Sequence, residues 1–151
     1  MGKRLYAYSI KTTRVRETDF PYNGQKITCT SELLDFARSL QEADTEKFLA
    51  IYLDAQNQII CIQTTNGTVN HSVAYPRELI RHALMVGACA IILAHNHPSG
   101  ALRPSPEDIH ITRLTTEIAQ HLGIKVHDHI IITDNGFYSF LEEGSMPELK
   151  S

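Results

Sequence analysis

The sequence predicts an α/β fold with a mixed central β-sheet sandwiched by helices. Short apolar runs rich in β-branched residues occur between amphipathic segments of helical period. The run "CAIILA" at residues 89–94 contains no polar residue, as expected of a central strand covered on both faces. With 151 residues, 42% of them hydrophobic, the chain is long enough to bury roughly 70% of its unfolded surface in a single domain.

The first part of the chain predicts one helix followed by a β-hairpin. Residues 4–17 alternate loosely between apolar and polar and are expected to form an edge strand, which "FPYNGQ" then ends. Residues 30–41 carry apolar side chains at helical spacing behind a Thr-Ser pair suited to an N-cap. Residues 46–54 and 56–64 are β-rich runs around "DAQN", whose residue types suit a tight turn.

The second part predicts further strands and two longer helices. Residues 67–75 are expected to form a third strand, and residues 76–88 a helix that begins with proline and has a glycine near its end. Residues 105–123 predict the best helix of the chain, with serine as N-cap, proline in the first turn and glycine at the end. Residues 125–133 and 137–142 predict two strands around the turn "DNG".

These elements predict one main domain with short flanking segments. Residues 1–27 are expected to be an N-terminal extension with an edge strand and a loop, residues 28–143 the domain, and residues 144–151 a polar C-terminal tail. The net charge is −3 and the basic residues are scattered, so nothing indicates a nucleic-acid or anionic-membrane surface. The three cysteines include no CxxC pair, and no apolar stretch is long enough to span a bilayer. We therefore expect a cytoplasmic protein.

Two histidines follow the apolar strand and predict a metal site. His95 and His97 are separated by one residue, seven residues separate His97 from Ser105, and Asp108 lies three positions further on. Side chains beyond the carboxyl end of a buried strand can point into one pocket, and the Pro/Gly loop can return the chain so that Asp108 reaches it. Two imidazoles and one carboxylate form a three-ligand set that leaves a fourth zinc position for water, the pattern of a catalytic zinc.

Each member of this set also has an ordinary structural explanation. A single histidine is more often a hydrogen-bonded structural residue than a ligand, and the chain has eight histidines. Ser105 and Asp108 are residue types that cap helices with or without a metal nearby. Coincidence would have to explain the paired histidines, the sharp loop and the acid at the helix start together. The length of the motif therefore favours a metal site.

A metal hydrolase also needs a base that takes a proton from water and delivers it to the leaving group. Glu46 directly precedes a predicted buried strand, where an ionised group can face a pocket. The ordinary explanation of Glu46 is that it is a solvated acid next to a strand. Spacing alone leaves Glu46 one candidate among several acids, the others being Glu32, Glu42, Glu78 and Glu107.

These residues resemble a known motif. Glu46, "HNHPSG" and "PSPED" are similar to the JAMM motif of JAB/MPN metallopeptidases, which combines an upstream Glu with H-x-H, seven residues and S-x-x-D. More narrowly, "EKFLAIYLDAQNQII", "GT" at residues 67–68, "YPRELIRHAL", "AIILAHNHPSG" and "HDHIIITDNGFYSF" resemble successive blocks of the RadC-like JAB domain. The resemblance covers about residues 28–143.

The resemblance implies a cytidine-deaminase-like architecture and a zinc-dependent hydrolase of amide or isopeptide bonds that uses a zinc-activated water. It implies one Zn²⁺ per chain, held by His95, His97 and Asp108. Glu46 matches the general acid/base and Ser105 the residue that helps to hold the oxyanion. The implied partner is a protein or peptide substrate.

The segment "HDH", residues 127–129, lies within the strand predicted over residues 125–133. Alternation along a strand places His127 and His129 on one face and Asp128 on the other. A second metal site is one interpretation. The interpretation we favour is that Asp128 or His129 orients a metal ligand through a hydrogen bond, as metal-bound histidines usually require.

Two other functions compete with hydrolysis of amide bonds. The letters "HNH" suggest a metal-dependent nuclease, but HNH nucleases draw these three residues from separate places in the chain. A non-catalytic JAB-type interaction module is the second alternative, and the intact set of ligands counts against it. The family's DNA-repair association has no support in this sequence, because the roughly 45 residues before Glu46 do not resemble a helix-hairpin-helix module. The loop "GALRP" also departs from the acidic "GD" start common in the family.

Overall fold

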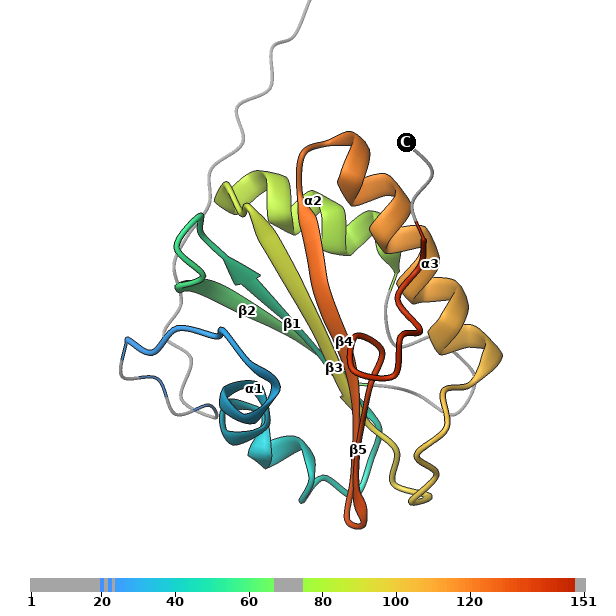
Figure 1. The fold of residues 1–151 in the computed structure, drawn as a ribbon. Helices are drawn as coiled ribbons and strands as arrows, with labels where there is room; N and C mark the ends of the chain where they lie inside the picture. The colour runs from blue at the N-terminus through green and yellow to red at the C-terminus, as the bar shows by residue number, and fades with distance from the viewer. Residues whose placement is uncertain (1–19, 21, 23, 67–74, 149–151) are drawn as a thin grey trace, which may run out of the picture.

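The computed structural model describes residue 20, residue 22, residues 24–66 and residues 75–148, which form a five-stranded sheet with helices on both faces (Figure 1). The α/β class with a mixed central sheet is therefore confirmed. The described elements, in chain order, are α1 (Thr30–Phe36), the 3₁₀ helix η1 (Arg38–Leu40), β1 (Lys47–Leu53), β2 (Ile59–Asn66), α2 (Pro76–Val86), β3 (Ala90–Asn96), α3 (Pro106–His121), β4 (Lys125–Thr133) and β5 (Gly136–Ser139).

The sheet has the strand order β2-β1-β3-β4-β5. β1 pairs antiparallel with β2 and β3, β3 pairs parallel with β4, and β5 closes the sheet antiparallel to β4. Every residue of β3 is buried, as predicted for the apolar run that precedes the paired histidines. The carboxyl ends of β3 and β4 therefore lie side by side at one edge of the sheet, where the polar residues follow.

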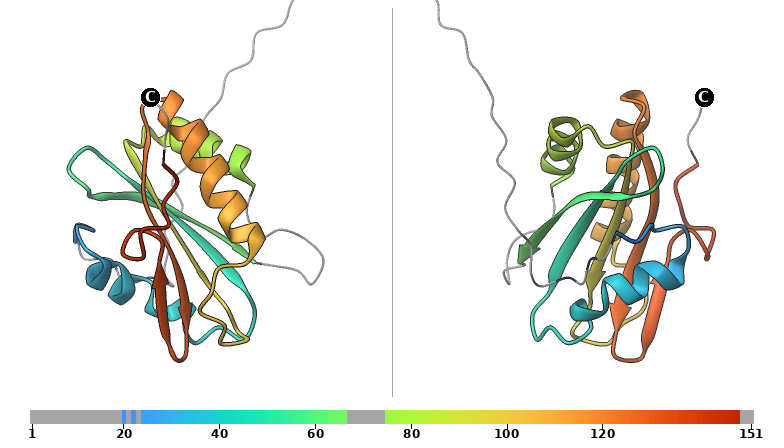
Figure 2. Two further views of the ribbon diagram at one scale, coloured as in Figure 1. Left: turned by 45° about the vertical axis from the view of Figure 1, so that its right-hand side comes forward. Right: turned by 90° about the vertical axis from the view of Figure 1, so that its left-hand side faces the viewer.

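Helices cover the two faces of the sheet separately, with α1 on one face and α2 and α3 on the other (Figure 2). The core on the α1 face contains Ile92, Ala94, Ile130 and Ile132 from the two central strands. The core on the α2–α3 face contains Ile91 and Leu93 together with apolar residues of both helices. This division follows the two-residue period of side chains along a strand.

The two longer helices begin where predicted and end two residues before the predicted ends. α2 begins at Pro76 and ends before Gly87, which has a left-handed φ of 70° that a residue with a side chain adopts only with strain. α3 begins after Ser105 in a capping box that pairs this serine with Asp108. The capping box fixes the first turn of α3, and with it the position of Asp108.

Three elements differ from the prediction by three or more residues at one end. The strand predicted over residues 56–64 begins at Ile59, because residues 54–58 form the turn. The predicted helix over residues 30–41 ends at Phe36, and the 3₁₀ helix that follows turns Leu40 into the core on the α1 face. β5 ends at Ser139, and just beyond it the Leu141 N–H donates to the carboxylate of Asp128.

The flanking segments contribute to the packing where they are described. Phe20 and Ile27, in the predicted N-terminal extension, are buried in the core on the α1 face. Met146, in the predicted polar tail, packs against the core on the α2–α3 face. The strands predicted over residues 4–17 and 67–75 fall on residues outside the described ones, apart from Tyr75.

In the described parts of the chain, no helix has the length and apolar character needed to cross a bilayer.

Candidate metal site

The side chains of His95, His97 and Asp108 meet where β3 ends and α3 begins. The Nε2 atoms of His95 and His97 lie 2.9 Å apart. The carboxylate of Asp108 lies 3.1 Å from Nε2 of His95 and 3.4 Å from Nε2 of His97. One ligand atom from each residue falls within 4.8 Å of the other two. The structure therefore brings together the three residues predicted as metal ligands, in an arrangement that could hold a metal ion.

The ring nitrogens that face away from this cluster have partners of their own. Nδ1 of His97 donates to the carbonyl oxygen of Ala101 at 2.7 Å. Nδ1 of His95 lies 2.8 Å from Nε2 of His129. When an imidazole is neutral, the nitrogen opposite its N–H carries a free lone pair. The Nε2 atoms that converge on Asp108 are therefore the ones available for a metal.

A hydrogen-bond chain fixes this tautomer of His95. The Thr112 hydroxyl donates its single proton to the carbonyl oxygen of Asp108 at 2.6 Å, one helical turn away. Its oxygen must then accept from Nδ1 of His129, which lies 2.6 Å away. Nε2 of a neutral His129 is consequently an acceptor, and His95 donates to it through Nδ1. α3 thus sets the orientation of His95 through Thr112 and His129.

Aromatic rings enclose the buried histidines. Phe48 stacks on His95 with ring centroids 6.0 Å apart and meets the ring of His129 edge-on at 5.8 Å. Phe140 stacks on the ring of His129 with centroids 5.0 Å apart. His95 and His129 are almost completely buried, whereas the side chain of His97 remains partly exposed. The cluster is therefore rigid on its inner side and open to solvent near His97.

The charges of the cluster are tightly coupled. Burial raises the pKa of Asp108, but hydrogen bonds from His95 and His97 outweigh it and hold the pKa far below its ordinary value. The hydrogen bond to Asp108 in turn raises the pKa of His97. Burial holds the pKa of His129 well below its ordinary value, so this ring stays neutral. A neutral His129 is what the hydrogen-bond chain requires.

Glu46 lies near the cluster without joining it. It is half-buried immediately before β1, and its negative charge adds to the hydrogen bond with Asp108 in raising the pKa of His97. It forms no hydrogen bond with another described residue. The carboxylate is thus close enough to act on the site electrostatically and is not committed elsewhere among the described residues.

Ser105 is engaged by the helix cap. Its hydroxyl donates to Oδ2 of Asp108 at 2.7 Å and accepts from the Asp108 backbone N–H at 3.1 Å. The hydroxyl therefore positions the carboxylate of Asp108 in this structure. Contact between Ser105 and an oxyanion stays a prediction, and it requires the hydroxyl to turn away from Asp108.

Of the two residues predicted to support a ligand, His129 contacts His95 and Asp128 does not reach the cluster. A register shift in β4 pairs Val126 with Ile91 and Asp128 with Ile92, which directs Asp128 to the α1 face. Its carboxylate accepts hydrogen bonds from the Ser139 hydroxyl and from two backbone N–H groups, those of His129 and Leu141.

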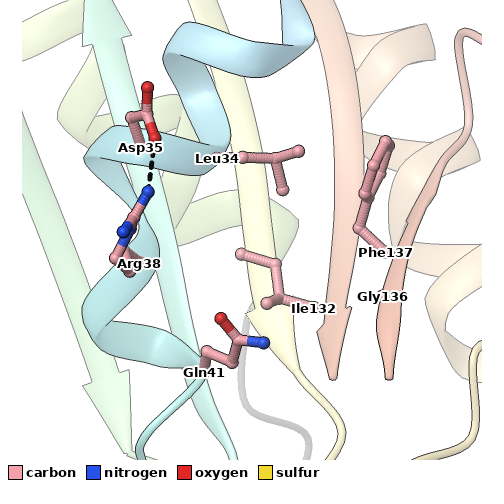
Figure 3. A pocket seen from close by; sticks show the side chains of 7 residues that line it. All are labelled: Leu34, Asp35, Arg38, Gln41, Ile132, Gly136 and Phe137. Carbon is pink, nitrogen blue, oxygen red and sulfur yellow. Dashed lines mark hydrogen bonds and ion pairs between the residues drawn. The ribbon is translucent and has the colours of Figure 1, made fainter. Parts of the chain in front are cut away.

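Two cavities lie near the carboxyl ends of β3 and β4. One has a volume of ≈ 340 Å³ and is lined by His97 and Asn96 together with residues of the segment before β1 and of the end of β4. The second, of ≈ 210 Å³, lies between α1, η1 and the β4–β5 hairpin, where Asp35 and Arg38 pair at 2.8 Å (Figure 3). Only the first cavity adjoins the cluster.

Two residues of this region were not predicted from the sequence. Thr112 follows Asp108 by four positions and so lies on the same helix face, a signal that helical spacing provides. Asn96 lies between the two histidines as a polar residue on a buried strand, where an unpaired amide would be costly. Both could have been found by asking what the buried polar residues next to the motif bind.

The chain is similar in sequence to known proteins over most of its length. Residues 27–145 match the family model described as RadC-like JAB domain. The chain is 43% identical over 124 residues to a UPF0758 protein of Geotalea uraniireducens, an alignment that covers 81% of this chain and 54% of the relative. It is 38% identical over 146 residues to a UPF0758 protein of Trichlorobacter lovleyi, which covers 95% of this chain and 59% of the relative.

A shorter relative aligns over more of its own length. The chain is 40% identical over 123 residues to the UPF0758 protein YkfG of Escherichia coli, covering 80% of this chain and 78% of the relative. Against the two longer relatives, by contrast, the chain spans little more than half of their length.

Proposed function

Because the chain belongs to the RadC-like JAB domain family, we propose that it is a zinc-dependent hydrolase of amide or isopeptide bonds. One observation carries the proposal: the Nε2 atoms of His95 and His97 converge on the carboxylate of Asp108 where β3 ends.

The donor set fits zinc in chemistry and in spacing. Zinc accepts imidazole nitrogen and carboxylate oxygen at distances of roughly 2.0–2.2 Å, so ligands at the corners of a tetrahedron lie roughly 3.3 Å apart. The three separations among His95, His97 and Asp108 are 2.9, 3.1 and 3.4 Å. The set contains no thiolate and only three protein ligands, which is the composition of a catalytic zinc site.

Glu46 is proposed as the group that moves the proton. A bound zinc would supply Lewis acidity, lowering the pKa of water and polarising a carbonyl group. The carboxylate of Glu46 would take a proton at this site and deliver it to the departing amine. Its half-buried position near His97 and its freedom from other described partners support this role.

The substrate is proposed to be a protein or peptide, inside the cytoplasm. The cavity of ≈ 340 Å³ next to His97 gives an extended chain a place beside the cluster. Cys29, Cys61 and Cys89 are all free thiols in the structure, which suits a reducing compartment.

Metal content tests the proposal first. We expect elemental mass spectrometry to find close to one zinc per chain in the wild type and none in a His95→Ala/His97→Ala variant. Glu46→Gln should retain zinc and lose hydrolysis of a peptide library by at least about 100-fold, because its side chain is the base and not a ligand. Folded wild-type protein that takes up no zinc when zinc is offered would contradict the proposal. It would favour a non-catalytic interaction module.

A further inference from the structure

The residue between the two histidines faces away from them. Asn96 is the last residue of β3, and alternation directs its side chain to the α1 face while His95 lies on the α2–α3 face. It is 2% exposed, so its amide must find partners within the protein. All three partners that it finds are backbone groups of the segment that carries Glu46.

These three hydrogen bonds bind residues just before and just after Glu46 in the sequence. The side-chain nitrogen of Asn96 donates to the carbonyl oxygens of Ala43 at 3.1 Å and Thr45 at 3.0 Å. Its side-chain oxygen accepts from the backbone N–H of Lys47 at 2.7 Å. Both donor hydrogens and one acceptor site of the amide are thereby used.

The sheet alone does not hold this segment against β3. The register pairs between β1 and β3 end at Phe48–His95, so no residue before Phe48 forms such a pair with β3. The N–H of Lys47 would be the next group of the ladder, and the side chain of Asn96 receives it instead. Asn96 therefore continues the attachment past the end of the ladder.

We propose that Asn96 is a positioning residue that fixes Glu46 relative to the metal-ligating residues His95 and His97. The end of β3 then has two tasks. On the α2–α3 face it carries His95, and on the α1 face the amide of Asn96 holds the segment that carries the proposed base. This inference rests on the proposed function for the role of Glu46. The attachment of residues 43–47 to Asn96 stands independently of it.

The test uses Asn96→Ala and Asn96→Asp in the full chain. Alanine removes all three hydrogen bonds, whereas aspartate keeps the shape and the acceptor but places a carboxylate against the carbonyls of Ala43 and Thr45. Gln41→Ala is the matched control, because Gln41 anchors the other end of the same loop through the carbonyl oxygen of Thr133 at 3.1 Å.

Amide hydrogen exchange in the metal-free protein tests the attachment without any activity. We expect the N–H of Lys47 to exchange at least about 10-fold faster in Asn96→Ala than in the wild type, while the amides of the β3–β4 ladder keep their protection. Gln41→Ala should leave Lys47 protected. Unchanged exchange of Lys47 in Asn96→Ala would overturn the proposal.

Zinc content and turnover test the positioning role. Both Asn96 variants should retain zinc, since neither changes a ligand, and should lose roughly 10–100-fold in kcat through displacement of the base. In a Glu46→Gln background the Asn96 substitution should add nothing, because both changes remove the same contribution. An equally large additional loss in that background would show a general structural effect and overturn the proposal.

Failure of the proposed function would look different. A wild type that binds zinc but hydrolyses no peptide would contradict the hydrolase and remove the role of Glu46. The exchange rate of Lys47 would still decide whether Asn96 holds the segment.

Discussion

The two faces of the sheet use buried polar side chains in different ways. On the α2–α3 face, His95, His129 and Thr112 bind one another in a continuous chain that ends at the candidate metal ligands. On the α1 face, Asn96 and Asp128 bind mainly backbone groups of neighbouring loops, apart from the bond of Asp128 to Ser139. Neighbouring residues of the same strands thus enter two kinds of network.

The difference shows that one strand can support a metal site on one face and hold loops in place on the other. Side-chain networks such as His95–His129–Thr112 fix tautomers and ring orientation, which a metal site requires. The side chains of Asn96 and Asp128 form hydrogen bonds with backbone groups beyond the ends of the strand ladders. Loops need such partners because their backbone groups have none in the sheet. Substitutions on the α2–α3 face should therefore change metal binding, and substitutions on the α1 face should change loop structure and stability.

The largest effect is expected at Asp108. Asp108→Asn removes the charged ligand and should weaken zinc binding by at least about 100-fold, measured by competition with a chelating dye. Glu107→Gln is the matched control, an exposed acid in the same helical turn, and should leave the affinity unchanged. Equal zinc affinity in Asp108→Asn and the wild type would remove Asp108 from the site.

His129 should have the next largest effect on metal binding. His129→Phe preserves an aromatic ring in contact with Phe48 and Phe140 but removes the acceptor for His95, and we expect zinc affinity to fall roughly 10–100-fold. The control is His127→Gln, on the same strand but bonded to Asn57 in the β1–β2 turn. Loss of affinity in the control alone would contradict the proposed hydrogen-bond chain.

Asp128 tests the opposite face. Asp128→Asn leaves at least one of the three donors around this carboxylate poorly paired, so the free energy of unfolding should fall by about 1–3 kcal/mol in urea titrations. Zinc affinity should stay within roughly twofold of the wild type, because Asp128 does not contact the cluster. A large loss of zinc from this variant, without loss of stability, would break the distinction between the two faces.

The pH dependence of stability distinguishes the buried neutral ring from the charged pair. Burial lowers the pKa of His129, so below roughly pH 6.5 the unfolded chain binds a proton that the folded metal-free chain does not. The free energy of unfolding should fall from pH 7.5 to 5.5 by up to about 1.4 kcal/mol per pH unit. The raised pKa of His97 acts oppositely: its contribution is fully present below roughly pH 6.5 and is lost as pH rises through its folded pKa.

Denaturant titrations of the metal-free protein at several pH values would measure this effect. His129→Phe should flatten the decrease at acidic pH, and His97→Gln should steepen it. A wild-type slope that His129→Phe leaves unchanged would place the titrating group elsewhere.

The smallest effect is expected at the pair that borders the second cavity. Asp35 and Arg38 are about seven-tenths exposed, so Asp35→Asn should change the free energy of unfolding by no more than about 0.5 kcal/mol. Zinc affinity should not change. A larger loss would mean that the Asp35–Arg38 pair contributes more to the free energy of unfolding than its exposure indicates.

Much of the fold was predictable because its elements carry local signals. The proline and glycine that bound α2, the serine and proline that begin α3 and the apolar run of β3 each fix structure within a few residues. The early end of α1 and the short β5 were not predictable, because Leu40 and Leu141 are placed by contacts made with distant strands.

The sequence by itself determined the α/β class and, through its spacing, the three residues that meet as candidate ligands. It could do so because His95 and His97 end a buried strand and Asp108 begins a capped helix, both local properties. Only the tertiary structure decided which of Asp128 and His129 reaches the cluster, since a register shift in β4 sets the face. It also decided the partners of Thr112 and Asn96, because a buried hydrogen-bonding group takes whichever partner folding brings within reach.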